Sequence, residues 1–196
     1  MMFQFSQKKK LAAQTNNFSN SQNTDSQLLL ESTEKNVLIA DEDPEVRNAL
    51  SVAVLRWAQE EQRKVKPVFV ANGKKAIDYV KKTSQKNPPL LAIFDLRMCQ
   101  MNGLESAQII SEICPQIPII ITIEPNEKDE KLIQKIDNFA HRNSHLGFIV
   151  RTKSSQLLKA SLEQEIRNLE HPHEKQKEEN NSLLGNLTEK ISSILN

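Results

Sequence analysis

The chain has 196 residues, with 26 basic and 25 acidic side chains and a formal net charge of +1. A balance this close to neutral excludes the strong single-sign field that is typical of nucleic-acid-binding proteins. With roughly 100–200 residues in a usual domain, and with 38% hydrophobic residues, the chain can fill one core but not two. We therefore expect a single folded domain with tails and no nucleic-acid partner.

The cysteine content and the hydropathy bear on the cellular compartment. Cys99 and Cys114 are too few for a disulfide framework. No stretch approaches the roughly 18 consecutive apolar residues that a membrane span requires. The first residues are followed by lysines at positions 8–10 rather than by an apolar region, so no signal peptide is expected. The sequence predicts a cytoplasmic protein with no membrane partner.

The N-terminal part is rich in Asn, Gln and Ser. In residues 14–27 only Phe18 and Asp25 interrupt a run of uncharged polar residues. Such a run cannot bury enough apolar area to offset the entropy lost on ordering. We therefore expect a disordered tail over residues 1–34.

From residue 36 onward, short apolar runs alternate with longer segments of helical period. This alternation is typical of a parallel sheet with helices on both faces. The expected strands are residues 37–40, 68–71, 90–94, 119–123 and 148–150. The expected helices begin near Pro44, Gly73, Gly103, Asn126 and Ser154. The sequence predicts an α/β fold over residues 35–170, a (βα)5 doubly wound parallel sheet of the flavodoxin-like type.

The first helix shows how these segments are recognised. Asp43 stands at the N-cap and Pro44 at the first helical position. Leu50, Ala53 and Trp57 then form one apolar stripe. We expect this stripe to face the sheet.

The C-terminal residues 171–196 differ from the domain before them. The segment His171-Pro172-His173 interrupts the helical pattern, and a charged stretch follows. Apolar residues then repeat at a spacing of three to four, at positions 184, 187, 191 and 194. This repeat is too short for a coiled coil. We expect a linker and a short amphipathic helix that docks on the domain or on a partner.

Charged and hydroxyl side chains close the predicted strands. The first strand ends at Asp41 and Glu42, the third ends at Asp95, the fourth contains Thr122, and the fifth ends at Arg151. Ligands of a doubly wound sheet bind outside these strand ends. Neighbouring carboxylates repel each other by about 1–4 kcal/mol per pair and need a cation between them. Oxygen ligands suit Mg²⁺, which keeps positions for water and phosphate oxygens, so the pattern indicates phosphoryl chemistry.

Four segments carry a resemblance to a known family. NVLIADEDPEVR, LLAIFDLRMCQMNGLE, IPIIITIEP and GFIVR resemble, in order, the signature segments of the receiver domain of two-component response regulators. The resemblance covers about residues 36–170 and describes a divergent, single-domain member. It implies a signalling protein rather than an enzyme, in which Asp95 accepts a phosphoryl group from a histidine kinase or phosphotransfer protein. It also implies that a downstream protein effector reads the signal, and that Mg²⁺ is held by Asp41, Glu42, Asp95 and the main-chain carbonyl of Arg97.

The predicted switch departs from the family pattern. Receivers carry a Ser or Thr after the fourth strand and a Lys after the fifth. Here Arg151 replaces the lysine; it keeps the charge but has a longer, planar head, and Lys153 could substitute for it. Counting along the fourth strand puts Ile123 at the hydroxyl position and Thr122 one place early, and a one-residue slip turns a side chain to the other face. Phe148 stands where the family has its switching aromatic, or is simply a core residue.

Two other hypotheses remain open from the sequence. The first is a receiver-like protein-interaction module without efficient phosphoswitching, because the departures fall in the switch and not among the acids. The second is a haloacid-dehalogenase-type phosphatase, whose D-x-D start Asp41 and Asp43 resemble, with Asp41 as the nucleophile. The Pro44-Glu45 continuation disagrees with that family, and Asp95 would have no role.

Overall fold

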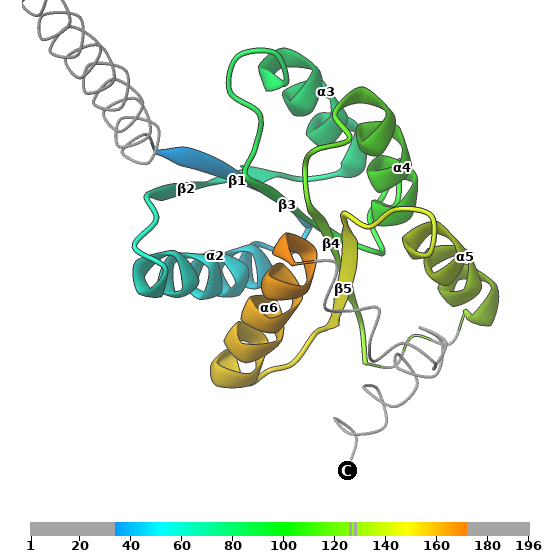
Figure 1. The fold of residues 1–196 in the computed structure, drawn as a ribbon. Helices are drawn as coiled ribbons and strands as arrows, with labels where there is room; N and C mark the ends of the chain where they lie inside the picture. Colours follow the sequence, from blue (N-terminus) through cyan, green and yellow to red (C-terminus); the bar gives the residue numbers. More distant parts are fainter. Residues whose placement is uncertain (1–33, 126, 128, 172–196) are drawn as a thin grey trace, which may run out of the picture. The chain divides into compact units, whose positions relative to one another are not determined.

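The computed structural model describes residues 34–125, 127 and 129–171. In this part of the chain, strands and helices alternate (Figure 1). The strands are β1 (Lys35–Ala40), β2 (Val65–Val70), β3 (Leu91–Asp95), β4 (Ile119–Ile123) and β5 (Leu146–Val150). The helices are α2 (Pro44–Glu60), α3 (Gly73–Thr83), α4 (Gly103–Ile113), α5 (Glu130–Ala140) and α6 (Ser155–Glu170). The predicted disordered tail, apart from Glu34, and the predicted C-terminal helix lie outside the described residues.

The sheet is parallel, with the strand order β2-β1-β3-β4-β5. The chain moves outward from β1 to β2 and then returns to β3 on the other side of β1. The order therefore reverses between β1 and β3, where doubly wound sheets open a crevice at the carboxyl ends of the strands. Ala40 pairs with Phe94, so Asp41 and Asp95 follow neighbouring positions at this crevice. The topology confirms the predicted (βα)5 doubly wound fold.

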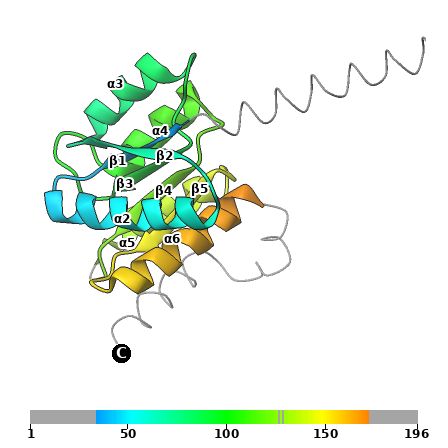
Figure 2. The ribbon, with the colours of Figure 1, turned by 90° about the vertical axis from the view of Figure 1, so that its left-hand side faces the viewer.

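Helices cover both faces of the sheet. α3, α4 and α5 lie on one face, and α2 and α6 lie on the other (Figures 1 and 2). Phe94 and Ile121 belong to the core under α3, α4 and α5, whereas Ile93 and Ile120 belong to the core under α2 and α6. The second core also contains the predicted apolar stripe of α2, formed by Leu50, Ala53 and Trp57. This alternation decides to which face each strand residue of the site points.

Two predicted boundaries are wrong by three residues or more, and the others differ from the structure by at most two. β2 begins at Val65, three residues earlier than predicted, and includes Pro67. The proline is tolerated because β2 is an edge strand, where a missing N–H need not break the ladder. α5 begins at Glu130 rather than near residue 126, because the side chain of Asp129 caps the helix there.

Candidate functional site

Asp41 directly follows β1 and is almost fully enclosed, with 1% of its surface exposed. Its Oδ1 accepts a hydrogen bond from the backbone N–H of Asp43 at 2.8 Å, and its carbonyl accepts one from Arg47 Nη1 at 2.6 Å. Asp43 in turn caps α2 by accepting from the N–H of Glu45 at 2.8 Å. These bonds hold the turn between β1 and α2. Burial raises the pKa of the Asp41 carboxyl.

Asp95 is the last residue of β3 and the second buried carboxylate of the crevice, with 5% of its surface exposed. Burial, opposed by Arg151 and reinforced by the charge of Asp41, raises its pKa to about 6. Its Oδ1 is enclosed but accepts no hydrogen bond from any described residue. The only charged group that an ion pair brings to this oxygen among the described residues is the Arg151 guanidinium, so the oxygen has a cation beside it but no hydrogen-bond donor.

The loop after β3 returns close to Asp95 and starts α4. The N–H of Gly103 donates to the carbonyl of Leu96 at 3.1 Å. A Cβ at position 103 would lie 2.3 Å from the carbonyl oxygen of Asp95, so this approach requires glycine. Asn102 and Glu105 form a capping box, with bonds of 2.9 Å and 3.3 Å between each side chain and the other's N–H. The Asn-Gly-Leu-Glu segment thus sets the position of α4 against the end of β3.

Arg151 follows β5 and places its guanidinium between the two buried carboxylates. Nη1 donates to Asp41 Oδ2 at 3.2 Å, and Nη2 forms an ion pair with Asp95 Oδ1 at 3.3 Å, outside hydrogen-bond geometry. Nη2 also pairs with Glu124, the residue after β4. Glu124 was not among the residues predicted for the site; its position directly after a strand end, like that of the other site residues, is the signal that could have found it. The exposed Lys153 does not take this place.

Glu42 is exposed and turns toward the loop between β3 and α4. Its Oε1 accepts a hydrogen bond from the backbone N–H of Cys99. Hydrogen bonding to Cys99 lowers the pKa of the Glu42 carboxyl. The structure therefore places Glu42 at the rim of the crevice, bonded to the loop and not to the two buried aspartates.

Arg97 lies two residues after Asp95 and extends its side chain away from the crevice. Its Nε and Nη2 donate to the two carboxylate oxygens of Glu127, each at 2.8 Å. Glu127 Oε1 also accepts from the N–H of Asp129, the cap of α5, at 2.9 Å. This bidentate pair connects the loop after β3 to the start of α5. The predicted use of the Arg97 carbonyl as a metal ligand stays a prediction.

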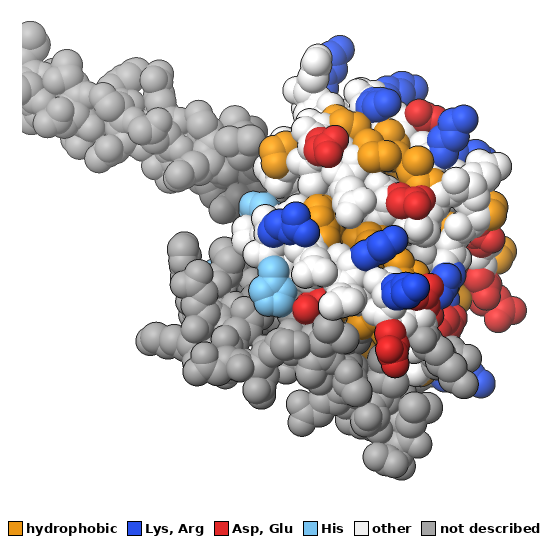
Figure 3. All heavy atoms as spheres, turned by 90° about the vertical axis from the view of Figure 1, so that its right-hand side faces the viewer, with side chains coloured by type: hydrophobic (Ala, Val, Ile, Leu, Met, Phe, Trp, Pro, Cys, Tyr) orange, Lys and Arg blue, Asp and Glu red, His pale blue; other side chains and the backbone are white. Residues whose placement is uncertain are grey.

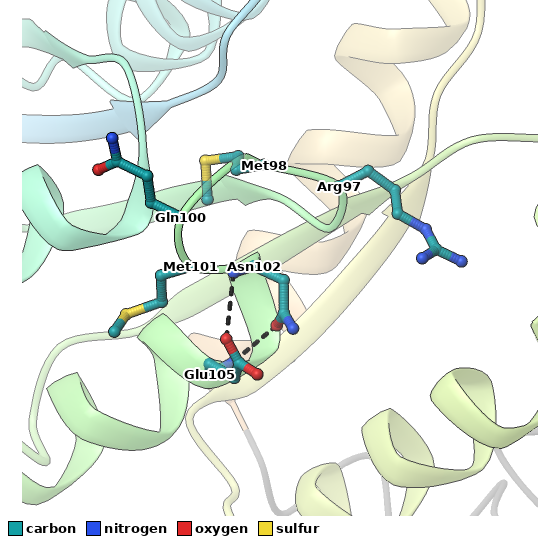
Figure 4. A pocket seen from close by; sticks show the side chains of 6 residues that line it. All are labelled: Arg97, Met98, Gln100, Met101, Asn102 and Glu105. Atoms are coloured by element: carbon teal, nitrogen blue, oxygen red, sulfur yellow. Dashed lines mark hydrogen bonds between the residues drawn. The ribbon is translucent and has the colours of Figure 1, made fainter.

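A shallow hollow of about 490 Å³ opens beside the same loop. Figure 4 shows the residues that line it, with the Arg97 side chain directed away from the other five. They are Arg97, Met98, Gln100, Met101, Asn102 and Glu105. The hollow is bounded by the capping box of α4 and two methionines, and it lies next to the loop and not between the buried aspartates.

Thr122 and Ile123 point to opposite faces of the sheet. Thr122 pairs with Asp95 in the β3–β4 register, and neighbours in a parallel register share a face. Its side chain is fully buried, and Oγ1 has no hydrogen-bond partner among the described residues. Ile123 instead packs in the other core, together with Phe148. The hydroxyl therefore lies on the Asp95 side of β4, and the aromatic lies on the opposite side.

The carboxylates of the crevice fit a hard divalent cation by their chemistry. Asp41 and Asp95 offer oxygen donors, and the enclosed Asp95 Oδ1 has no hydrogen-bond donor. Within the described ranges, however, no group of three or more His, Cys, Asp or Glu side chains is arranged to hold a metal ion. In this arrangement Glu42 is bonded to Cys99, and Arg151 stands between the aspartates.

Comparison with solved structures gives the same fold. A response regulator receiver domain protein from Clostridium thermocellum is 11% identical, with a TM-score of 0.52, and the match covers 68% of this chain and 95% of that chain. The signal receiver domain of an HD domain-containing protein from Pseudomonas fluorescens is 17% identical, with a TM-score of 0.52, and the match covers 71% of this chain and 92% of that chain. Identities this low speak for the fold alone.

The sequence itself identifies the family. Among the curated proteins, none matches this chain. The family model described as the response regulator receiver domain matches residues 37–141, which is more than half of the chain. The matched segment runs from within β1 to the residue after α5 and includes the buried aspartates at the ends of β1 and β3. The chain belongs to the response regulator receiver domain family.

Proposed function

We propose that the protein is a phosphoacceptor of a two-component phosphorelay, in which Asp95 takes a phosphoryl group from a phosphohistidine. The observation that carries this proposal is the Asp95 carboxylate itself. It stands at the switch point of the sheet, it is 5% exposed, and its Oδ1 accepts no hydrogen bond from the described residues. The family membership of the chain supports the same assignment.

The reaction joins one carboxylate oxygen of Asp95 to phosphorus while the bond from phosphorus to the histidine nitrogen breaks. The leaving imidazole keeps the electron pair of that bond. Asp41, Asp95, the Glu42 side chain and the Arg97 carbonyl would hold Mg²⁺, which supplies neutralisation of the phosphoryl oxygens. The Arg151 guanidinium lies beside Asp95 and Glu124, so it is within reach of a phosphoryl group that extends from Asp95 and can pair with its oxygens.

We propose that the donor is a histidine kinase or phosphotransfer protein and that the output is contact with a protein effector rather than enzymatic turnover. On the face shown in Figure 3, basic, acidic and apolar side chains are interspersed. A nucleic-acid surface would instead gather one sign of charge, so this face favours a protein partner.

No helix in the described part of the chain has the length and apolar character to cross a membrane. Both Cys99 and Cys114 are free thiols, which supports a cytoplasmic location.

One observation favours a second candidate, a protein-interaction module without efficient phosphoswitching. Thr122 and Phe148 lie on opposite faces of the sheet, so a hydroxyl drawn toward Asp95 would not vacate space for the aromatic. The phosphatase hypothesis has less support, because Asp43 is the N-cap of α2 and accepts from the N–H of Glu45. An acid engaged in this bond is poorly placed to protonate a leaving group.

The test is chemical mapping of an aspartyl phosphate. The purified chain is incubated with Mg²⁺ and acetyl phosphate, the acyl phosphate is reduced with borohydride, and the modified residue is located by mass spectrometry. We expect modification of Asp95, and none in Asp95→Asn. Asp78→Asn, which removes an exposed carboxylate of α3, is the matched control and should label like the wild type. Label on Asp41 would favour the phosphatase, and no label at any aspartate would favour the interaction module.

A further inference from the structure

The guanidinium of Arg151 stands where two buried carboxylates face each other. Asp41 Oδ2 lies 3.2 Å from Nη1, and Asp95 Oδ1 lies 3.3 Å from Nη2. The arginine side chain is itself 14% exposed, so this contact is largely enclosed. The planar fork of an arginine can reach two carboxylates at once, which a single ammonium cannot do with the same geometry.

We propose that Arg151 is a built-in counter-cation of the acidic crevice, and that a divalent metal ion binds Asp41 and Asp95 only by displacing it. The inference rests on the proposed function, in which these aspartates are metal ligands. Arg151 now takes Asp41 Oδ2 and Asp95 Oδ1, and a metal ion bound to these two oxygens would need both within about 2.0–2.1 Å, where the guanidinium could not stay in contact with them. The two cations therefore exclude each other.

Glu124 provides the position to which Arg151 is released. Its carboxylate is 45% exposed and pairs with the same Nη2 that faces Asp95. Arg151 Nε is buried and donates to no described residue, so the side chain is held only by its terminal nitrogens. Rotation toward Glu124 would free both aspartates while Arg151 keeps one ionic partner. Glu124 is thus a positioning residue for the exchange between arginine and metal.

The absence of a ready metal cluster in the described residues agrees with this view. One guanidinium offsets part of the negative charge of Asp41 and Asp95 from within the chain. The affinity for a divalent metal ion then depends on how firmly Arg151 is held as well as on the number of acidic ligands.

The test is the Mg²⁺ affinity of the full chain, measured by isothermal titration calorimetry at constant pH. We expect Arg151→Gln to bind Mg²⁺ at least about tenfold more tightly than the wild type, because no cation must leave. Arg151→Lys keeps the charge but cannot span both aspartates, so it should bind with intermediate affinity. Circular dichroism checks that each variant is folded. If Arg151→Gln does not fold, the comparison of Arg151→Lys with the wild type still decides the test.

The control separates a bridging role from simple charge. Lys153→Gln removes the same charge two residues after Arg151, from an exposed side chain that does not take the place between Asp41 and Asp95. We expect this variant to bind Mg²⁺ within about twofold of the wild type. Glu124→Gln should weaken Mg²⁺ binding, because Arg151 loses the partner to which it is released.

Two results would overturn the inference. The first is an Arg151→Gln affinity equal to or below that of the wild type, and the second is equal affinity in Arg151→Lys and the wild type. Acetyl phosphate labelling at saturating Mg²⁺ distinguishes this failure from failure of the proposed function. If Mg²⁺ binds Arg151→Gln most tightly, Arg151→Lys less tightly and the wild type least tightly, but Asp95 is not labelled, the counter-cation inference stands and the phosphoacceptor assignment falls. If Asp95 is labelled but the affinities do not follow this order, the phosphoacceptor assignment stands and the counter-cation inference falls.

Discussion

Replacement of Asp95 by asparagine should stabilise the fold at neutral pH, even though it removes the proposed phosphoacceptor. The carboxyl has a pKa raised from 3.8 to about 6, with burial as the largest cause. The native state therefore holds the ionised form less favourably than the unfolded chain does. Asparagine has nearly the same shape and carries no charge, so Asp95→Asn removes this penalty.

The pH dependence has a definite sign. Below pH 3.8 the carboxyl is protonated in both states, and ionisation contributes nothing to the stability difference. Between pH 3.8 and about 6 the unfolded chain releases the proton first, so the wild type loses stability as pH rises. A shift of this size corresponds to about 3 kcal/mol, which is fully lost above the native pKa.

The assay is urea unfolding of wild type and Asp95→Asn at several pH values from 4 to 7.5, with a chelator present to exclude divalent ions. The free-energy difference should move in favour of Asp95→Asn by about 2–3 kcal/mol across this range and level off above the native pKa. Asp78→Asn serves as the control for net charge, because Asp78 is exposed on α3. A difference in unfolding free energy that does not change with pH would refute the burial argument. So would a wild type that becomes more stable relative to Asp95→Asn as the pH rises.

Two further substitutions test the packing of the site. Gly103→Ala should destabilise the fold by about 1–3 kcal/mol in urea unfolding, because its Cβ meets the backbone of Asp95 at 2.3 Å; an unchanged midpoint would mean that the loop moves freely. Thr122→Val should stabilise the fold by about 1 kcal/mol, because it removes a buried hydroxyl without a hydrogen-bond partner among the described residues. A lower Tm for Thr122→Val in thermal unfolding would show that Oγ1 has a partner in solution.

The apolar strands and the helix starts made the fold predictable. Both faces of β3 and β4 are covered, and every residue of these strands is buried, so their sequences carry no polar alternation. The convergence of Asp41 and Asp95 was predictable for the same reason, since parallel strands end at one edge. The start of α5 was not, because the side chain of Asp129 competes for the helix N-terminus in a segment that has several acidic residues.

The contacts within the site depend on side-chain geometry that no local pattern records. Glu42 and Asp41 are adjacent in sequence, yet Asp41 is 1% exposed and Glu42 bonds to the backbone N–H of Cys99, 57 residues away. The pairing of Arg151 with Glu124 joins the ends of β4 and β5. Predicting either contact requires the path of the loops beyond the strand ends, which the hydrophobic periodicity of the sequence does not specify.

The sheet face to which Thr122 points determines which part of the domain would respond to a phosphoryl group at Asp95. Thr122 and Asp95 are register partners on the face of Ile93 and Ile120, which α2 and α6 cover. Arg151 is joined to α6 by a loop of three residues that ends at the N-cap Ser154. A new anion at Asp95 would change the partners of Arg151 first, and the shortest covalent path from Arg151 leads to α6. The opposite core, with Phe148 and Ile123, would respond only through the strands themselves.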